Sequence, residues 1–273
     1  MQITINPKRL ESIISKMLLK GKYFSGTTSS IGTISNYVTL EVKNNCLNIY
    51  NGNNTTLCAF TIPVMQTPSH YVTNGTLIEI IEEGECVVEI SNLVTRLKGF
   101  NIQTISLKAR DTLVLSSLTG NTKFTMALTL NHPNPAMIHR AKTMTKKGVP
   151  YAFKIPYLVG KTELNSLVST SSENMGNVVK GCDVLSNGKY KFNLEEDNSL
   201  TISSETSATD KYSSRVVTNS IGGEAATVEF AGPFFPFFSE KNSTIINIVM
   251  RDDSPIVFYS NDRLILKAPF VEG

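Results

Sequence analysis

The sequence predicts an α+β fold built from two similar halves. Most of its 273 residues fall into short segments in which β-branched and polar residues alternate, as in half-buried strands. Only a few segments show helical spacing. The same order of a strand, a helix, strands, a second short helix and further strands occurs in both halves, and such an internal repeat outweighs any single motif as a guide to the fold.

The composition excludes several classes of protein. Hydrophobic residues make up 41% of the chain and charged residues 18%, which is ordinary globular usage rather than that of a disordered, collagen-like or coiled-coil chain. No apolar run approaches the roughly 18 residues that would span a bilayer. The opening segment Met1–Leu10 lacks the apolar stretch of a signal peptide. We therefore expect a soluble, intracellular protein with two domains and no membrane contact.

The strands of the first half are separated by turn signals such as Lys43-Asn44-Asn45. We predict these strands at Gln2–Ile5, Ser35–Lys43, Cys46–Tyr50, Thr56–Pro63, Cys86–Ile90, Ile102–Ala109, Thr112–Ser117 and Lys123–Leu128.

The clearest helix begins after Asn6-Pro7, an N-cap residue followed by proline at the first helical position. Its apolar residues share one face of a 3.6-residue helix, which we expect to pack on a sheet: Leu10, Ile13, Ile14, Met17 and Leu18. Beside that face, Arg9, Lys16 and Lys20 form a basic stripe.

A second, shorter helix is predicted from Ser91 to Gly99. Its inward residues are Leu93, Val94 and Leu97, and its outward residues include Arg96 and Lys98.

The segment from Asn131 to Pro150 is interrupted by prolines and carries several Lys and Arg residues, so we predict a basic linker. The domains are then residues 1–132 and 151–273, joined by a connector over 133–150. In the second half we predict a strand at Tyr151–Ile155, a helix at about 160–171, strands near 177–185, 189–194, 198–204 and 211–221, and a short helix at Gly232–Lys241.

Four phenylalanines lie between Gly232 and Phe238. We predict that Phe237 and Phe238 are core residues and that Phe234 or Phe235 is the better candidate for exposure.

Motifs of catalysis are missing. The sequence has no phosphate-binding loop, dinucleotide-binding fingerprint, metalloprotease motif or hydrolase nucleophile motif. The four cysteines contain no C-x-x-C pair, so we expect buried thiols. His132 and His139 lie in the predicted linker, where exposed side chains are expected. We predict no catalytic residue, no metal and no cofactor.

The C-terminal third carries a recognisable series of segments. Phe237-Phe238 is followed by Ser243–Met250, by Asp253-Ser254-Pro255-Ile256-Val257 and by Leu264–Pro269. This series resembles the end of a DNA sliding clamp of the proliferating cell nuclear antigen (PCNA) family, and the run from Gly84 to Leu128 is similar to a clamp domain. The resemblance implies duplicated clamp domains, each with two helices packed on antiparallel sheets. It also implies a homotrimeric ring of six domains whose helices line the hole, since a chain of this length has two domains rather than three.

A ring around DNA needs positive residues on its inner helices, where they face phosphates without reading bases. We therefore predict DNA contacts from Arg9, Lys16, Lys20, Arg96, Lys98, Lys161 and Lys241. The alternative for each of them is an ordinary solvated surface position.

Clamps of this family tether polymerases and other replication proteins through short hydrophobic peptides bound beneath the linker. The resemblance maps that pocket onto Pro255, Leu266, Ala268 and Pro269, with Leu57, Met137 and Ile138 as further candidates. It implies double-stranded DNA, a DNA polymerase and a clamp loader as partners.

The sequence thus predicts a non-enzymatic processivity factor located with DNA inside the cell. Two other classes stay open, an open non-ring DNA-binding accessory protein and an all-β structural or interaction protein.

Overall fold

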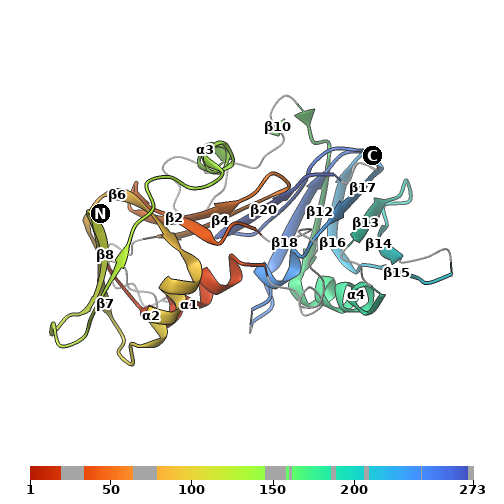
Figure 1. The fold of residues 1–273 in the computed structure, drawn as a ribbon. Helices are drawn as coiled ribbons and strands as arrows, with labels where there is room; N and C mark the ends of the chain where they lie inside the picture. The colour runs from red at the N-terminus through yellow and green to blue at the C-terminus, as the bar shows by residue number, and fades with distance from the viewer. Residues whose placement is uncertain are drawn as a thin grey trace. The chain divides into compact units, whose positions relative to one another are not determined.

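The structure is a computed structural model of the chain, shown in Figure 1. It describes residues 1–19, 34–63, 79–144, 158–159, 162–185, 189–205, 209–240 and 242–269. The chain divides into two compact units. Unit 1 takes Met1–Leu18, Ile34–Asn53 and Cys58–Ala152, and unit 2 takes Leu19–Thr33, Asn54–Leu57 and Phe153–Gly273.

Unit 1 contains two groups of antiparallel strands. The first has the order β5-β1-β7-β8-β9, with β1 (Gln2–Ile5), β5 (Glu79–Glu82), β7 (Ile105–Ala109), β8 (Thr112–Ser117) and β9 (Lys123–Ala127). The second has the order β4-β3-β2-β6, with β2 (Tyr37–Lys43), β3 (Cys46–Gly52), β4 (Thr56–Pro63, whose first two residues belong to unit 2) and β6 (Gly84–Glu89). The predicted strands of this half are all present, because alternating side chains and tight turns are local signals.

Helices α1 (Pro7–Lys16) and α2 (Ile90–Lys98) of unit 1 pack side by side (Figure 1). The Asn6 side chain accepts a hydrogen bond from the Arg9 main-chain N–H at 3.0 Å, so the predicted N-cap is confirmed. Of the predicted apolar face of α1, Leu10, Ile13, Ile14 and Met17 are buried and Leu18 is half-buried. In α2 the predicted Leu93 and Leu97 are buried together with Ile90, whereas Val94, predicted to point inward, is half-buried.

The predicted linker contains a helix that was not predicted from the sequence, α3 (Pro135–Met144). Pro135 stands at its first position, where the missing N–H of proline breaks no helical hydrogen bond. The Asn134 carbonyl accepts from the main-chain N–H groups of Met137 and Ile138, both at 3.2 Å. The helix packs on β3. A proline taken as a helix breaker is therefore a helix start.

Unit 2 contains a larger sheet and a smaller one. The larger has the order β16-β12-β18-β19-β20, with β12 (Ser166–Ser171), β16 (Thr218–Gly223), β18 (Ile245–Met250), β19 (Ile256–Tyr259) and β20 (Arg263–Lys267). The smaller has the order β15-β14-β13-β17, with β13 (Lys189–Leu194), β14 (Leu200–Glu205), β15 (Lys211–Arg215) and β17 (Ala226–Ala231). A short pair joins β10 (Leu158–Val159) to β11 (Thr162–Glu163), and helix α4 (Ser172–Leu185) packs on β14 and β15 (Figure 1).

Two predictions near the start of unit 2 are wrong. Residues 166–171, within the predicted helix at 160–171, form strand β12, and the helix α4 lies where a strand was predicted near 177–185. The spacing of Leu164, Leu167 and Val168 suits a helix, but β12 is hydrogen-bonded on both edges, to β16 and β18, and that pairing overrides local preference. The predicted strand Tyr151–Ile155 lies outside the described residues.

The Phe-rich segment forms a single 3₁₀ turn, η1 (Phe235–Phe237), instead of the predicted helix at Gly232–Lys241. Phe237 and Phe238 are fully buried, as predicted. Of the two candidates for exposure, Phe235 is half-buried, whereas Phe234 is fully buried and its ring stacks on Phe258 with centroids 4.5 Å apart.

All four cysteines are buried and form no disulfide, as expected. None of the helices in the described parts of the chain is long and apolar enough to cross a membrane.

Candidate DNA-facing helices and peptide-binding residues

Helix α1 carries three cations and one carboxylate. Arg9 and Lys16 are half-buried and, being seven residues apart, share one flank of the helix, as predicted. The Arg9 Cζ lies 5.8 Å from the ring centroid of Phe60 in β4, a cation–π contact that restrains the guanidinium. Lys8 is exposed and was not among the predicted DNA contacts. Lys8, Ser12 and Lys16 are spaced by four residues and therefore follow one side of the helix. This spacing is the sequence signal that indicates Lys8 as a further candidate for DNA contact.

The two predicted cations of α2 do not share a face. Arg96 and Lys98 are two residues apart, which separates them by about 160° around the helix axis. Arg96 is half-buried with its Cζ 5.8 Å from the ring centroid of Phe124 in β9, whereas Lys98 is exposed. Between these flanks the exposed residues are uncharged: Ser91, Asn92 and Thr95. A phosphate backbone above α2 would meet hydroxyl and amide groups as well as cations.

In unit 2 the helix α4 presents a face without net charge. Its exposed residues include Glu173, Asn177, Lys180 and Val184, which recur with helical spacing. Lys180 was missed because the helix was predicted in the wrong place. The three remaining predicted DNA contacts, Lys20, Lys161 and Lys241, lie outside the described residues.

The structure brings several predicted peptide-binding residues together in unit 2. The Ala268 main-chain N–H donates to the Thr55 carbonyl at 2.8 Å, which places the end of β20 beside the start of β4. Ile256 pairs with Lys267, so Pro255 and Ala268 follow as neighbours. Leu57 and Leu266 are fully buried beneath this surface, while Pro255, Ala268 and Pro269 are half-buried. The three half-buried residues are the ones that a peptide could touch.

The buried Lys267 fixes this arrangement from within. Its ammonium donates to Thr56 Oγ1 at 3.0 Å and to the Ala231 carbonyl at 3.1 Å, with the side chain only 1% exposed. Truncating this side chain would leave buried acceptors without a donor, which is costly.

The two remaining predicted peptide contacts lie in α3 of unit 1. Ile138 is buried in the packing of α3, and Met137 is half-buried.

His132, expected to be exposed, is 4% exposed just before α3. Its Nδ1 accepts from the Asn134 main-chain N–H at 3.0 Å, so Nδ1 carries no proton. Its Nε2 lies 3.2 Å from the Tyr37 carbonyl, to which it donates in that tautomer. Burial lowers the pKa of His132 and outweighs its main-chain hydrogen bonds. A neutral His132 therefore ties the start of α3 to β2.

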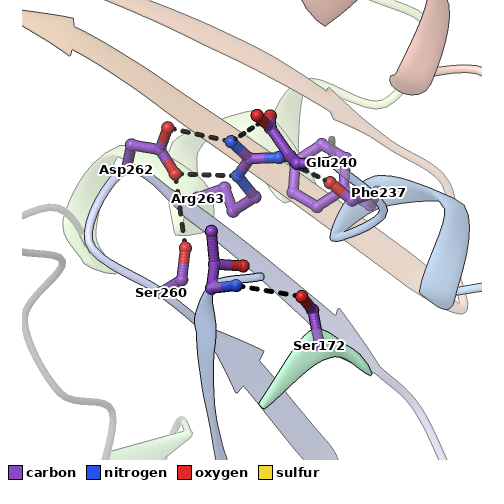
Figure 2. Close-up of polar contacts among 7 residues, drawn as sticks. Ser172, Phe237, Glu240, Ser260, Asp262 and Arg263 are labelled. Carbon is purple, nitrogen blue, oxygen red and sulfur yellow. Dashed lines mark hydrogen bonds and ion pairs between the residues drawn. The ribbon is translucent and has the colours of Figure 1, made fainter. Parts of the chain in front are cut away.

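Figure 2 shows a second anchor, in which Arg263 of β20 lies between Asp262 and Glu240. Its Nε donates to Asp262 Oδ1 and its Nη2 to Glu240 Oε1, both at 2.7 Å. Nη1 donates to the Phe237 carbonyl at 2.9 Å. Burial acts to lower the pKa of Arg263, but the hydrogen bonds and charges of Asp262 and Glu240 prevail and raise it. The cluster ties the Phe-rich turn to the hairpin of β19 and β20, which carries the candidate peptide-binding residues.

No protein-family model matches the sequence, and no curated protein matches it. Solved structures do match. A PCNA from A. fulgidus, solved with the C-terminal region of FEN-1 bound, is 13% identical, with 100% of each chain covered and a TM-score of 0.66. The DNA polymerase III beta subunit of Thermotoga maritima is 16% identical with a TM-score of 0.66, and the match covers 100% of this chain and 66% of that one. A PCNA from Entamoeba histolytica is 10% identical with a TM-score of 0.62, with 99% of this chain and 98% of that one covered. The chain therefore has the sliding-clamp fold along its whole length.

Proposed function

We propose that this chain is a DNA sliding clamp, a non-enzymatic ring that encircles duplex DNA and tethers a polymerase and other replication proteins to it. The observation that carries the proposal is the clamp fold over the full chain together with the cationic flank of α1, where Lys8, Arg9 and Lys16 outnumber the single Glu11. Such a surface attracts the phosphate backbone without reading its sequence.

The sheet edges support closure into a homotrimer. In the described part of the chain, β9 ends the first sheet of unit 1 and β15 ends the smaller sheet of unit 2. Each offers a row of main-chain hydrogen-bonding groups with which another chain can pair. A head-to-tail contact between the two edges uses different surfaces of each subunit, and such contacts form a ring when the rotation from one subunit to the next closes. Three chains give the six units of the proposed ring.

Partner proteins are proposed to bind through short hydrophobic peptides. The A. fulgidus PCNA was solved with the C-terminal region of FEN-1 bound. On this chain we assign Pro255, Ala268 and Pro269 as peptide contacts, supported from beneath by Leu57 and Leu266. A clamp loader that opens the ring is part of the proposal.

The test uses topology and needs no loader. The protein is mixed with linear duplex DNA, the DNA is circularised by ligation, and the complex is washed at high salt and then cut once. A closed ring is retained on the circle and lost after the cut, because salt removes electrostatic contacts but cannot unthread a ring. Loss in the wash would instead favour an open DNA-binding protein. Absence of any DNA binding, with assembly intact, would favour a structural protein.

A further inference from the structure

Helix α4 of unit 2 carries two glycines in its interior, Gly176 and Gly181. A Cβ built on Gly181 would come within 2.1 Å of Tyr212 Cζ, and one built on Gly176 would come within 2.5 Å of Phe235 Cζ. Two aromatic rings therefore lie directly on the backbone of the helix. At both positions a side chain larger than hydrogen would have to push the ring aside.

The sequence of α4 favours a helix only weakly. Its 14 residues include the two glycines and several residues of low helix propensity: Asn174, Asn177, Val178, Val179 and Val184. A helix of this length and composition is marginal by itself in water. The order of α4 therefore depends on what packs against it, and the two rings are part of that packing.

Two ties hold α4 to the interior of unit 2. The Phe235 ring comes from the turn η1, whose residue Phe237 is fully buried. Near the other end of the helix, the hydroxyl of the buried Tyr190 in β13 donates to Asp183 Oδ1 at 2.5 Å. The third tie differs, because Tyr212 belongs to β15, the strand that ends the smaller sheet in the described part of the chain.

The strand β15 is itself held lightly. It pairs with β14 along one edge. Its ion pairs join Lys211 to Glu205 at 3.0 Å and Arg215 to Asp197 at 2.7 Å, but all four side chains are exposed, and such pairs contribute little stability. Tyr212 is half-buried and is the one aromatic residue of the strand. Its contact with α4 is consequently a substantial part of what keeps β15 in place.

We propose that Tyr212 is a positioning residue that couples the edge strand β15 to α4, so that pairing of another chain with β15 stabilises the helix. A second strand on this edge suppresses the opening of β15 and thereby holds the Tyr212 ring on Gly181. By reciprocity, an ordered α4 makes β15 a better partner for that strand. The inference rests on the proposed function in one respect, that the pairing strand comes from a neighbouring subunit.

The coupling changes what an unassembled chain can do. Elements with few apolar contacts open locally without global unfolding, and β15 and α4 both meet that description. Outside the ring, α4 is then loosely held, and Lys180 on its exposed face has no fixed position. Assembly removes this freedom before any duplex is bound, so the cost of ordering the helix is not charged to DNA binding.

Hydrogen exchange in the dilute, unassembled chain tests the contact itself. Tyr212→Ala should accelerate exchange in both α4 and β15 by about five- to tenfold, because both lose the same ring. Tyr212→Phe retains the ring and is the matched control, for which exchange should stay at the wild-type rate. Acceleration of β15 alone would show that the ring does not support α4 and would overturn the inference.

A double-mutant cycle tests whether the ring and the glycine act together. Alanine is a better helix former than glycine, so Gly181→Ala in the Tyr212→Ala background should slow exchange in α4 by up to about fivefold. In the wild-type background the same substitution displaces the Tyr212 ring, and the slowing should be absent. Equal effects of Gly181→Ala in the two backgrounds would overturn the coupling.

The second measurement compares exchange in α4 between dilute protein and protein concentrated enough to associate, as followed by native mass spectrometry. In wild type, exchange around Gly181 should slow at least about threefold on association. Phe235→Ala, which removes the other ring, should keep this response. In Tyr212→Ala, β15 should become protected while α4 does not. Gly181→Ala should behave in the same way, so the result does not depend on one variant.

The outcomes separate this inference from the proposed function. Protection of β15 on association without any response of α4 in wild type would overturn the coupling and leave the ring intact. Association that does not protect β15, or no association at any concentration, would instead refute the pairing that the proposed ring requires. The double-mutant cycle in the unassembled chain decides the coupling of Tyr212 to α4 in either case.

Discussion

Gly223 at the end of β16 lies so close to Asn165 that a Cβ built on it would come within 2.0 Å of the Asn165 carbonyl oxygen. The φ angle of Gly223 is +101°, a conformation that L side chains rarely adopt. Beside this contact, where β12 begins, the Ser166 hydroxyl donates to the Glu224 carbonyl at 2.5 Å.

We expect Gly223→Ala to destabilise unit 2 by about 2–4 kcal/mol, because both the clash with main-chain atoms and the backbone conformation oppose a methyl group. Gly222→Ala is the matched control, since no atom lies within 4 Å of a Cβ at that position and its φ is ordinary. Urea denaturation followed by circular dichroism measures both. Equal stability of the two variants would contradict the close approach of Gly223 to Asn165.

Charge reversal on α1 tests the DNA-facing surface. The double variant Lys8→Glu and Lys16→Glu should weaken binding to linear duplex and reduce the salt dependence of log K by about one unit of slope for each phosphate that is no longer neutralised. Lys43→Glu reverses one charge at the exposed end of β2, outside α1 and α2, and should leave the slope unaltered. An unchanged slope in the double variant would remove α1 from the DNA-binding surface.

Arg263→Lys tests the anchor of the Phe-rich turn. A lysine retains the charge but cannot reach Asp262, Glu240 and the Phe237 carbonyl together, because it lacks the planar fork of the guanidinium. We expect a loss of about 1–2 kcal/mol, and about 2–3 kcal/mol for Arg263→Met, since Glu240 and Asp262 are partly exposed and regain some solvation. Thermal denaturation gives the order of stability, and Arg263→Met more stable than Arg263→Lys would contradict the role of charge in the cluster.

The burial of His132 predicts a stability that depends on pH. Its pKa is lowered in the folded chain, so below its ordinary value of about 6.5 the unfolded chain binds more protons than the folded one. This contribution is intact above about pH 6.5 and is lost as the pH falls through the lowered pKa.

Melting temperatures between about pH 8 and about pH 5 measure this loss. His132→Gln should flatten the acid side of the profile, whereas His139→Gln, at an exposed position of α3, should keep it. An unaltered acid limb in His132→Gln would show that other groups cause the acid sensitivity.

The sequence is most informative where structure depends on neighbours in the chain. β1, β4, β8 and β13 have the predicted bounds, and the cap of α1 by Asn6 follows from a single dipeptide. β12 and α4 were predicted in the wrong order because apolar spacing over six residues fits either period, and only the pairing with β16 and β18 decides between them. Tertiary hydrogen bonds of this kind leave no local signature.

The candidate sites divide in the same way. Arg9 and Lys16 could be placed on one flank from periodicity alone. Lys180 could not be placed on a helix face, because the helix was predicted at about 160–171 and a strand was predicted where Lys180 lies. The ion pairs of Lys142 with Glu41 and Glu85 could not be predicted either, since the two glutamates come from strands that are brought together only by folding. The burial of His132 depends on β2 in the same manner.

The exposed face of α4, on which Glu173 and Lys180 cancel, has a mechanical consequence for the proposed ring. A duplex passing through the ring would meet three attractive surfaces from α1 and three neutral surfaces from α4. The electrostatic potential around the duplex would then vary with threefold periodicity. The axis of the duplex would then have three equivalent off-centre resting positions. Hopping among these positions, in place of smooth gliding, would set the friction of translocation.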